Sequence, residues 1–378
     1  MHMKKVIFFI NSDWYFKLHW IDRALALKKE GYEVYLLMRF HNHELLKELE
    51  NTGFICLESG IDERSFSFTN FSRSAWGIYK KIKLIEPDLI HCVTIKPIII
   101  GGIISKYRNI PFIAGFVGLG RVFSGEKRRY NILGCLISFL YGYIFNRELT
   151  RLIFESESDK EILISRCGVP KNKCLVINGG GININNLNAT NENNNDIPVV
   201  LFASRLIYPK GLQDLIEIHQ SLSEKGHEFI LNIAGIYCPG DSEAIPVSVI
   251  NEWSKIKNIN YLGKRDDVYQ LISSSNIIAL PSTYNEGVPM ILIEACALRR
   301  AVIAYDSGGI SAIVKNNVNG FLINKKDKAE LEIKLYEMLK DDSLRKKMGE
   351  AGEKLVKDEF ISDKIINATL SVYKEIIK

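Results

Sequence analysis

Short apolar runs rich in β-branched residues alternate along this chain with longer segments of helical spacing. Near-continuous apolar strands that alternate with helices are typical of a parallel sheet covered on both faces, so the pattern predicts a doubly wound α/β fold. We expect early strands over 4–10, 33–38, 89–93 and 111–115, with helices over 18–30 and 76–86. Later strands are expected over 199–204, 228–234, 276–281 and 301–305, each followed by a helix. The pattern therefore occurs twice and predicts two domains.

An Asn- and Gly-rich stretch separates the two halves. Residues 178–195 read NGGGININNLNATNENNN, a composition that cannot build a core. We expect a first domain over 1–177, a linker over 178–196, a second domain over 197–357 and a final helix over 358–378. Periodicity does not fix where the final helix packs, and a return to the first domain is one option. Ligands of such sheets bind outside the carboxyl ends of the strands, so the loops there are the candidates for chemistry.

Composition narrows the class of protein. The 378 residues are 47% hydrophobic and 25% charged, an ordinary globular mixture, and the net charge of +5 is too mild to predict a nucleic-acid partner. Residues 1–180 hold 26 basic and 18 acidic residues, whereas residues 181–378 hold 23 and 26. The first half is therefore the half expected to meet something anionic.

Cysteine usage and apolar runs indicate the compartment. The seven cysteines form no C-x-x-C pair, which fits a reducing cytosol and predicts neither disulfides nor a zinc site. The run over 6–10 is too short for a signal peptide, and no uncharged apolar stretch has the length of a transmembrane helix.

The segment IIALPSTYNEGVPMILIEACALRRAVIAYDSGG, residues 277–309, is the most informative. A strand ends near Leu280, and Pro289 is expected in the first turn of the next helix, whose free N–H groups suit a phosphate. Glu286 falls in the loop, while Glu294 lies within an apolar helical run, where a carboxylate needs a partner. A glutamate at a helix start often only complements the helix dipole, and one in the middle of a helix is usually solvated. The two glutamates together with the Gly-Val-Pro turn between them favour a binding role.

The segment VVLFASRLIYPKGLQDLIE, residues 199–217, carries two cations after a strand. Arg205 can hold a diphosphate bidentately and Lys210 can act as a point charge. Taken alone, the two cations are equally well explained as a solvated pair on a surface loop. If this loop faces the one that contains Glu286, an anion site is favoured, with Lys210 and Glu286 outside the core.

The spacing R-x4-K-G followed by E-G-x-P-x4-E-A resembles glycosyltransferase family 4, and the resemblance covers nearly the whole chain. Gly263 after the short strand INYLG, the run SGG at 307–309 and NGFL at 319–322 also fit. The segments TIKPIIIGG (94–102) and GFVGLGRVF (115–123) resemble a branch that adds sugars to polyprenyl-diphosphate carriers in bacterial surface-polysaccharide assembly. The resemblance implies the GT-B fold, in which two Rossmann-like doubly wound domains face each other across a cleft.

The resemblance also implies roles. Arg205, Lys210 and Glu286 would form the catalytic set, the two cations on the donor diphosphate and Glu286 on the sugar hydroxyls. Glu294 would accept from the ribose, and the turn at Gly263 and Arg265 would face the base. The backbone around sugar and phosphate would come from Gly287, Val288, Pro289, Met290 and Ile291. Breaking a glycosyl–phosphate bond calls for positive charge on the departing diphosphate rather than a carboxylate pair. No metal or other cofactor is expected beside the nucleotide sugar.

The first domain departs from the family pattern at two places. Residues 11–14, NSDW, stand where many relatives have Gly-Gly, and residues 116–120 stand where many have a histidine. His91 lies one strand earlier, either facing the cleft or satisfied within its strand. Asn11, Lys96 and Gly118 are the weaker acceptor-side candidates. Asp266 and Asp267 suggest a metal motif only superficially, because Asp267 precedes an apolar run and is expected to cap a helix.

Residues 130–145, YNILGCLISFLYGYIF, carry no charge and are too short to span a bilayer comfortably. Basic residues flank them: Arg121, Lys127, Arg128, Arg129, Arg147 and Arg151. Either this is a buried core helix, or its exposed apolar side rests on anionic lipid.

We therefore predict a retaining glycosyltransferase, peripheral on the inner face of the cytoplasmic membrane. It would move a hexose or N-acetylhexosamine from a UDP-sugar to a polyprenyl-diphosphate-linked saccharide in O-antigen or capsule synthesis. The alternatives are a nucleotide-sugar epimerase, a transferase with a soluble acceptor, and a catalytically idle scaffold. A Rossmann dehydrogenase is disfavoured, because no G-x-G-x-x-G follows the first strand.

Overall fold

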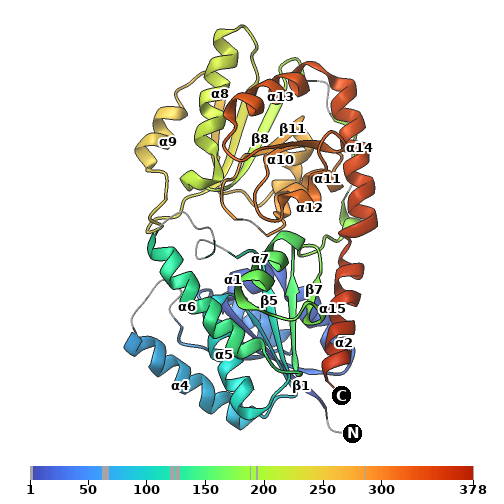
Figure 1. Cartoon of the computed structure of the whole chain (residues 1–378). Helices are drawn as coiled ribbons and strands as arrows, with labels where there is room; N and C mark the ends of the chain where they lie inside the picture. The colour runs from blue at the N-terminus through green and yellow to red at the C-terminus, as the bar shows by residue number, and fades with distance from the viewer. Residues whose placement is uncertain are drawn as a thin grey trace. The chain divides into compact units, whose positions relative to one another are not determined.

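The computed structural model describes residues 3–61, 68–119, 123, 128–187, 189–192, 195–285 and 287–377. The chain divides into two compact units (Figure 1). The first unit comprises Met1–Gly180 together with Ser362–Lys378, and the second comprises Gly181–Ile361.

The first unit is built on a parallel sheet with strand order β3-β2-β1-β4-β5-β6-β7. Its strands are β1 (Lys5–Ser12), β2 (Glu33–Arg39), β3 (Ile55–Glu58), β4 (Leu89–Val93), β5 (Phe112–Phe116), β6 (Thr150–Phe154) and β7 (Cys174–Val176). Its helices are α1 (Asp13–His19), α2 (Ile21–Lys29), α3 (His43–Asn51), α4 (Phe68–Ile85), α5 (Ile95–Arg108), α6 (Arg128–Phe145), α7 (Glu157–Cys167) and α15 (Ser362–Ile376). The order reverses between β1 and β4, which is where such sheets bind ligands.

Alternate residues of these strands belong to two separate cores. Ile7 and Phe9 of β1 pack in a core with residues of α4, α5, α6 and α7. Phe8 and Ile10 pack in the other core, with residues of α1, α2, α3 and α15. Because side chains alternate across a strand, these two cores are the two faces of the sheet. The C-terminal helix α15 thus completes one face of the N-terminal sheet, where it packs beside α2.

The second unit has strand order β10-β9-β8-β11-β12-β13, again parallel. The strands are β8 (Val199–Arg205), β9 (Ile230–Ile236), β10 (Ile259–Gly263), β11 (Ile277–Leu280), β12 (Ala301–Tyr305) and β13 (Gly320–Ile323). The helices are α8 (Leu212–Glu224), α9 (Val247–Trp253), α10 (Val268–Ser274), α11 (Met290–Ala297), α12 (Ile310–Ile313), α13 (Lys328–Lys340) and α14 (Asp342–Glu359). The order reverses between β8 and β11, so the two strands that precede the predicted donor loops are neighbours.

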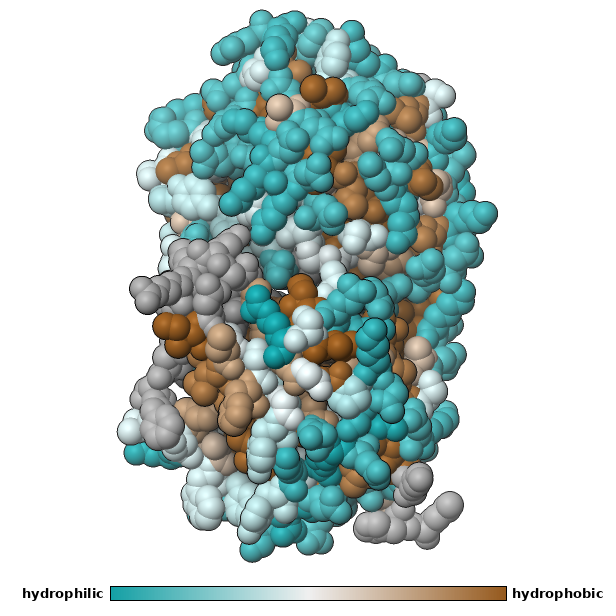
Figure 2. All heavy atoms as spheres, in the orientation of Figure 1, coloured by the Kyte–Doolittle hydropathy of each residue, from teal (hydrophilic) through white to brown (hydrophobic). Residues whose placement is uncertain are grey.

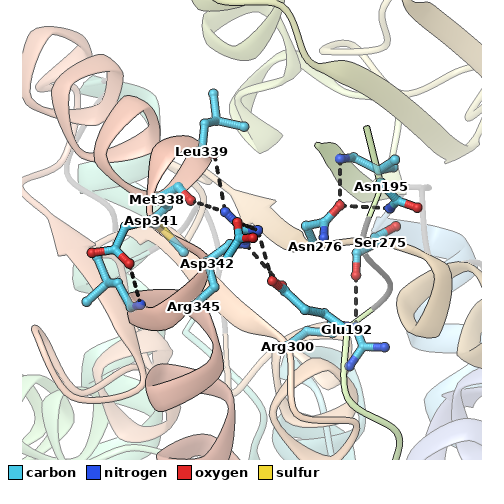
Figure 3. A network of polar contacts seen from close by, with 12 residues as sticks. Glu192, Asn195, Ser275, Asn276, Arg300, Met338, Leu339, Asp341, Asp342 and Arg345 are labelled. Atoms are coloured by element: carbon cyan, nitrogen blue, oxygen red, sulfur yellow. Dashed lines mark hydrogen bonds and ion pairs between the residues drawn. The ribbon is translucent and has the colours of Figure 1, made fainter. Parts of the chain in front are cut away.

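Part of the stretch predicted as a linker over 178–196 is fixed to the second unit. The buried Arg345 of α14 donates to both carboxylate oxygens of Glu192, at 3.0 and 2.9 Å. The Asn195 amide donates to Asn276 Oδ1 at 2.9 Å. Figure 3 shows these contacts together. A segment too polar for a core is therefore held through side-chain pairs, and the boundary between the units falls at Gly180 and Gly181.

Two predicted helices differ from the observed ones. The helix expected over 18–30 is two helices that break at Trp20 (φ −127°), whose buried ring packs 4.8 Å from His91. The helix expected over 358–378 begins instead at Ser362, because α14 continues to Glu359. Apolar spacing runs through both breaks, so periodicity alone does not reveal them.

Candidate functional site

Two loops meet at the carboxyl ends of β8 and β11. A 3₁₀ turn, Tyr208–Lys210, follows β8, and the carbonyl of Pro209 accepts a hydrogen bond from the Thr283 N–H at 2.7 Å. Gly211 ends the turn with φ +80°, and a Cβ there would lie 1.9 Å from the carbonyl oxygen of Pro281. Only glycine fits this close approach, so Gly211 allows the two loops to touch.

The two cations, one at the end of β8 and one in the turn after it, lie over the same aromatic ring. The guanidinium carbon of Arg205 and the Nζ of Lys210 are each 5.7 Å from the ring centre of Tyr284, in the loop after β11. Lys210 is only 7% exposed, so the expectation that it lies outside the core is wrong. The loop after β11 covers its turn through hydrogen bonds to Pro209.

Tyr284 is a site residue that the sequence reasoning missed. Its carbonyl accepts a hydrogen bond of 2.7 Å from the buried Ser307, which lies in the loop after β12. The loops after three strands that are neighbours in the sheet, β8, β11 and β12, thus meet around Tyr284 and the two cations. An aromatic residue two positions before Glu286, in a loop after a strand, is the signal that could have identified it.

Helix α11 presents its N-terminus to the same edge. Pro289 is the N-cap, with φ −67° and ψ 125°, rather than a residue of the first turn, because this extended ψ places it outside the helix. No side chain in the described part of the chain caps this end, so its first N–H groups stay available to an anion. Gly287, Val288, Met290 and Ile291 surround the cap, whereas Glu286 lies outside the described residues.

Glu294 lies in the second turn of α11 in a poorly solvated place. Burial raises the pKa of its carboxyl group to about 7. Tyr269 of α10 lies close enough that Glu294 adds to the rise in the pKa of its phenol, which burial mainly causes. A carboxylate enclosed in this way gains from hydroxyl donors, which favour its ionised form.

The remaining donor-side candidates lie at the end of β10. Gly263 has φ +68° and follows an irregularity in the pairing of β10 with β9. Arg265 pairs with Asp267, at 2.7 and 2.5 Å. Asp267 is at the N-cap position of α10 but its side chain makes no cap bond, because its carboxylate is taken by Arg265. Over the described ranges, no group of His, Cys, Asp and Glu side chains has the arrangement of a metal site.

In the first unit, the three weaker candidates lie at one edge of the sheet. Asn11 is in β1, Lys96 is in the first turn of α5 after β4, and Gly118 (φ +84°) follows β5. These strands are neighbours in the order β1-β4-β5, so their carboxyl ends adjoin. The buried Asn11 Oδ1 has no hydrogen-bond partner among the described residues. Thr94, which precedes α5, has φ +75°, a strained conformation for a β-branched residue.

His91 is a fully buried strand residue rather than a residue open to a ligand. Its Nδ1 is hydrogen-bonded to the hydroxyl of Tyr373 from α15. Burial, together with Arg23, lowers the pKa of His91 to about 3, so the ring is neutral. Asp13 is likewise structural, because its Oδ2 accepts from the N–H groups of His41 and Asn42 at 2.9 Å.

Helix α6, which covers residues 130–145, has one face buried in the core and one exposed apolar face. The face of α6 that packs in the core is made of Ile137, Tyr141, Ile144 and Phe145. The opposite side carries an exposed apolar stripe made of Ile132, Leu136, Phe139 and Tyr143. No helix within the described ranges is long and apolar enough to cross a membrane. Of the flanking cations, Arg147 donates to Ser105 and Arg151 pairs with Glu375. Arg121 and Lys127 lie outside the described residues, as do the side chains of Arg128 and Arg129.

Both units match family models of sugar-transferring enzymes. Residues 5–156 match the model described as glycosyl transferase 4-like, and residues 183–355 match the model described as glycosyl transferases group 1. The two matches cover the strands and loops that carry the candidate residues of each unit.

Known proteins resemble the chain over most of its length. An N,N'-diacetylbacillosaminyl-diphospho-undecaprenol alpha-1,3-N-acetylgalactosaminyltransferase of Campylobacter jejuni is 26% identical and covers 93% of this chain and 94% of its own. A UDP-Gal:alpha-D-GlcNAc-diphosphoundecaprenol alpha-1,3-galactosyltransferase of Escherichia coli is 26% identical, over 75% of this chain and 79% of its own. The crystal structure of Anabaena HepE with UDP and glucose superposes with a TM-score of 0.78 at 19% identity, covering 99% of this chain and 100% of that one. The units therefore have the GT-B type of Rossmann-like fold.

Proposed function

The chain belongs to glycosyltransferase family 4, and from this premise we propose that it transfers a sugar from a UDP-sugar to a polyprenyl-diphosphate-linked saccharide. The sugar would be a hexose or N-acetylhexosamine, transferred with retention, and the product would enter O-antigen or capsule assembly. Names of relatives that specify diphospho-undecaprenol acceptors support this proposal. Because such an acceptor is anchored in lipid, the enzyme would act peripherally on the inner face of the cytoplasmic membrane.

The observation that carries the proposal is the meeting of the loops after β8 and β11. It places Arg205 and Lys210 over one ring, in the unit whose helix α11 has no side-chain cap at its N-terminus within the described ranges. Two cations and free helix N–H groups suit a diphosphate. Glu294, further along α11, suits hydroxyl donors such as those of a ribose.

The chemistry follows from charge. As the bond between the sugar and the diphosphate breaks, negative charge grows on the departing diphosphate while the sugar becomes oxocarbenium-like. Arg205 and Lys210 would stabilise that anion, and Tyr284 would hold both cations in place. In a retaining reaction the acceptor hydroxyl attacks from the same face, and its proton passes to the departing phosphate. This route calls on no metal or further cofactor, and we propose none.

On the acceptor side, the edge formed by Asn11, Lys96 and Gly118 would receive the diphosphate-linked saccharide. Lys96 supplies a cation in the first turn of α5, which has no acidic residue there. An anion at this helix start would be favoured by both the ammonium group and the free N–H groups.

A thermal-shift panel with UDP, GDP, ADP, CMP and their sugars tests the donor. A ligand that binds only the folded protein raises Tm, so a selective shift by UDP-sugars is expected, and Glu294→Gln should reduce it. Glu350→Gln, an exposed glutamate of α14, is the matched control and should behave as wild type. A shift by GDP- or ADP-sugars alone would contradict the proposed donor, and no shift at all would contradict the site.

Transfer itself is tested with the donor selected in this way and a polyprenyl-diphosphate-linked saccharide, by chromatography of the lipid product. Anomeric couplings in the NMR spectrum of the product show whether configuration is retained. A donor that is hydrolysed or epimerised without transfer would favour the epimerase alternative.

A further inference from the structure

Helices α4, α5 and α6 form one continuous surface of the first unit. The rings of Tyr79 in α4 and Tyr107 in α5 meet edge to face at 6.3 Å. The ammonium group of Lys106 in α5 lies 3.5 Å from the ring centre of Tyr143 in α6. These contacts link the three helices side by side, as Figure 1 shows.

Large apolar side chains are exposed across this surface. Helix α6 contributes its stripe, in which Phe139 is 75% exposed, and α5 contributes Ile103 and Tyr107, the latter 77% exposed. Helix α4 contributes Trp76. Figure 2 shows hydrophobic residues gathered over α6. Exposed apolar side chains gathered on one surface indicate a site of association. We call the α6 stripe with Trp76, Ile103 and Tyr107 the apolar face.

Charge on the three helices has a single sign. The sequence places four Lys or Arg residues in α4, three in α5 and two in α6, and no Asp or Glu in any of them. Cations also lie directly beside the exposed rings, since Lys80 is 5.5 Å from the ring centre of Trp76. Glu86 follows α4 and is opposed by Arg108 at 3.8 Å.

From these observations we infer that the apolar face docks on an anionic lipid bilayer. Aromatic rings with adjacent cations suit the boundary between headgroups and acyl chains, where tryptophan and tyrosine are enriched. A basic surface without acidic residues complements a negatively charged leaflet. A protein partner would have to present an apolar surface that is itself acidic, whereas a bacterial bilayer has both properties at once.

The face also adjoins the proposed acceptor edge. Helix α5 carries Lys96 in its first turn and Ile103 two turns later, a separation of roughly 10 Å along the helix. Docking would therefore bring the carrier's diphosphate, which lies at headgroup level, within reach of Lys96. This part of the inference rests on the proposed function, whereas the docking itself does not.

Vesicle flotation of the full chain tests the inference. The probes are vesicles of phosphatidylcholine alone and of equal parts phosphatidylcholine and phosphatidylglycerol, without polyprenyl carrier or nucleotide. We expect wild type to float with the anionic vesicles and to partition at least about tenfold less onto neutral ones. The double variant Ile132→Glu, Phe139→Glu should lose about tenfold or more on the anionic vesicles.

The matched control is Ile333→Glu. Ile333 lies in α13 of the second unit and is 63% exposed, against 67% for Ile132, so this variant should float as wild type. Both variants change exposed residues, and their thermal unfolding is compared with wild type. Wild type that does not float, or a double variant that floats unchanged, would overturn the inference. The inference would also be overturned if wild type self-associates without binding vesicles and the double variant is monomeric.

The UDP-sugar thermal shift, measured on the same samples, separates the two proposals. A normal shift without flotation rejects the docking surface alone, whereas flotation without any nucleotide shift rejects the proposed donor site alone.

Discussion

Lys210 is a buried cation, and this decides how its role is tested. Truncation to alanine would remove both the charge and the buried stem of the side chain, so Lys210→Met is the more informative change. Turnover should fall on the order of a hundredfold or more, because a charge aimed at the leaving diphosphate acts mainly in the transition state.

Steady-state kinetics with the UDP-sugar measure this effect, and chemical denaturation should show stability within about 1 kcal/mol of wild type. Lys346→Met, at an exposed position of α14, is the control. Wild-type turnover from Lys210→Met would remove the lysine from the mechanism.

Tyr284 positions two cations through its ring face. Tyr284→Ala should weaken UDP binding by up to about thirtyfold, because the two cation–ring contacts, at about 1 kcal/mol each, together amount to about 2 kcal/mol. Tyr284→Phe keeps the ring and should stay close to wild type in the same titration. Equal affinities for the alanine variant and wild type would show that Arg205 and Lys210 are held by other contacts.

Glu294 makes stability depend on pH. Burial raises the pKa of its carboxyl from 4.5 to about 7, so the native state holds a proton that the unfolded state has released. Stability is therefore lost as pH rises from about 4.5 through 7, by up to about 3 kcal/mol. Glu294→Gln lacks this loss and should be more stabilised relative to wild type at pH 8 than at pH 5, by chemical denaturation.

The ionisation of Glu294 should also change UDP binding, but in the opposite direction: stability falls as pH rises, whereas affinity for UDP should rise. The ionised carboxylate is the better acceptor for ribose hydroxyls, so UDP affinity of wild type should fall as pH drops from 8 to 6. Glu294→Gln is titrated in parallel by calorimetry. Ionisation of the UDP phosphates changes with pH in the same way for both proteins, so a difference between their pH profiles comes from Glu294. Identical pH profiles in the two proteins would exclude Glu294 from the ribose site.

Among the elements, α15 is joined to the sheet by a buried polar contact. The Tyr373 hydroxyl is the partner of His91 Nδ1, and His91 Nε2 has none among the described residues. Tyr373→Phe would leave both ring nitrogens unpartnered and should cost about 1–3 kcal/mol in thermal or chemical unfolding. Tyr143→Phe, at an exposed tyrosine of α6, should cost little. A stability unchanged by Tyr373→Phe would mean that the contact carries no net energy.

His91 also gives this contact a pH dependence. Its pKa falls from 6.5 in the unfolded chain to about 3 in the fold, so the unfolded state binds the proton first. The stability contributed by the neutral ring is fully present above about pH 6.5 and is lost as pH falls toward 3.

At the scale of the whole molecule, the first unit is assembled from both ends of the chain. Helix α15 buries Ile365, Leu370, Val372, Tyr373 and Ile376 in the first unit. Burying each such side chain is worth about 1.5–3 kcal/mol, so their sum is comparable to the whole stability of a typical domain.

Truncation after Ile361 should therefore unfold the first unit while the second retains its cooperative transition. Calorimetry and limited proteolysis of residues 1–361 measure this. A truncated chain that keeps both transitions would show that the first sheet is stable without its last helix.

The sequence by itself determined the fold class and the family. The strands expected over 89–93 and 301–305 match β4 and β12, since buried parallel strands are continuous apolar runs that local composition reveals. The sequence also placed Arg205 and Lys210 at the end of one strand and Glu294 in the helix after another, because the ends of apolar strands can be read locally. Their roles in the site stay a prediction.

Only the tertiary structure decided the contacts made between distant segments. The burial of Lys210 and the placement of Tyr284 beside two cations arise where loops after different strands meet, and the raised pKa of Glu294 arises from the burial of α11 in the folded unit. No local pattern encodes these contacts. Where α15 packs was open for the same reason: an amphipathic helix requires an apolar face to cover, and its own sequence does not say which one.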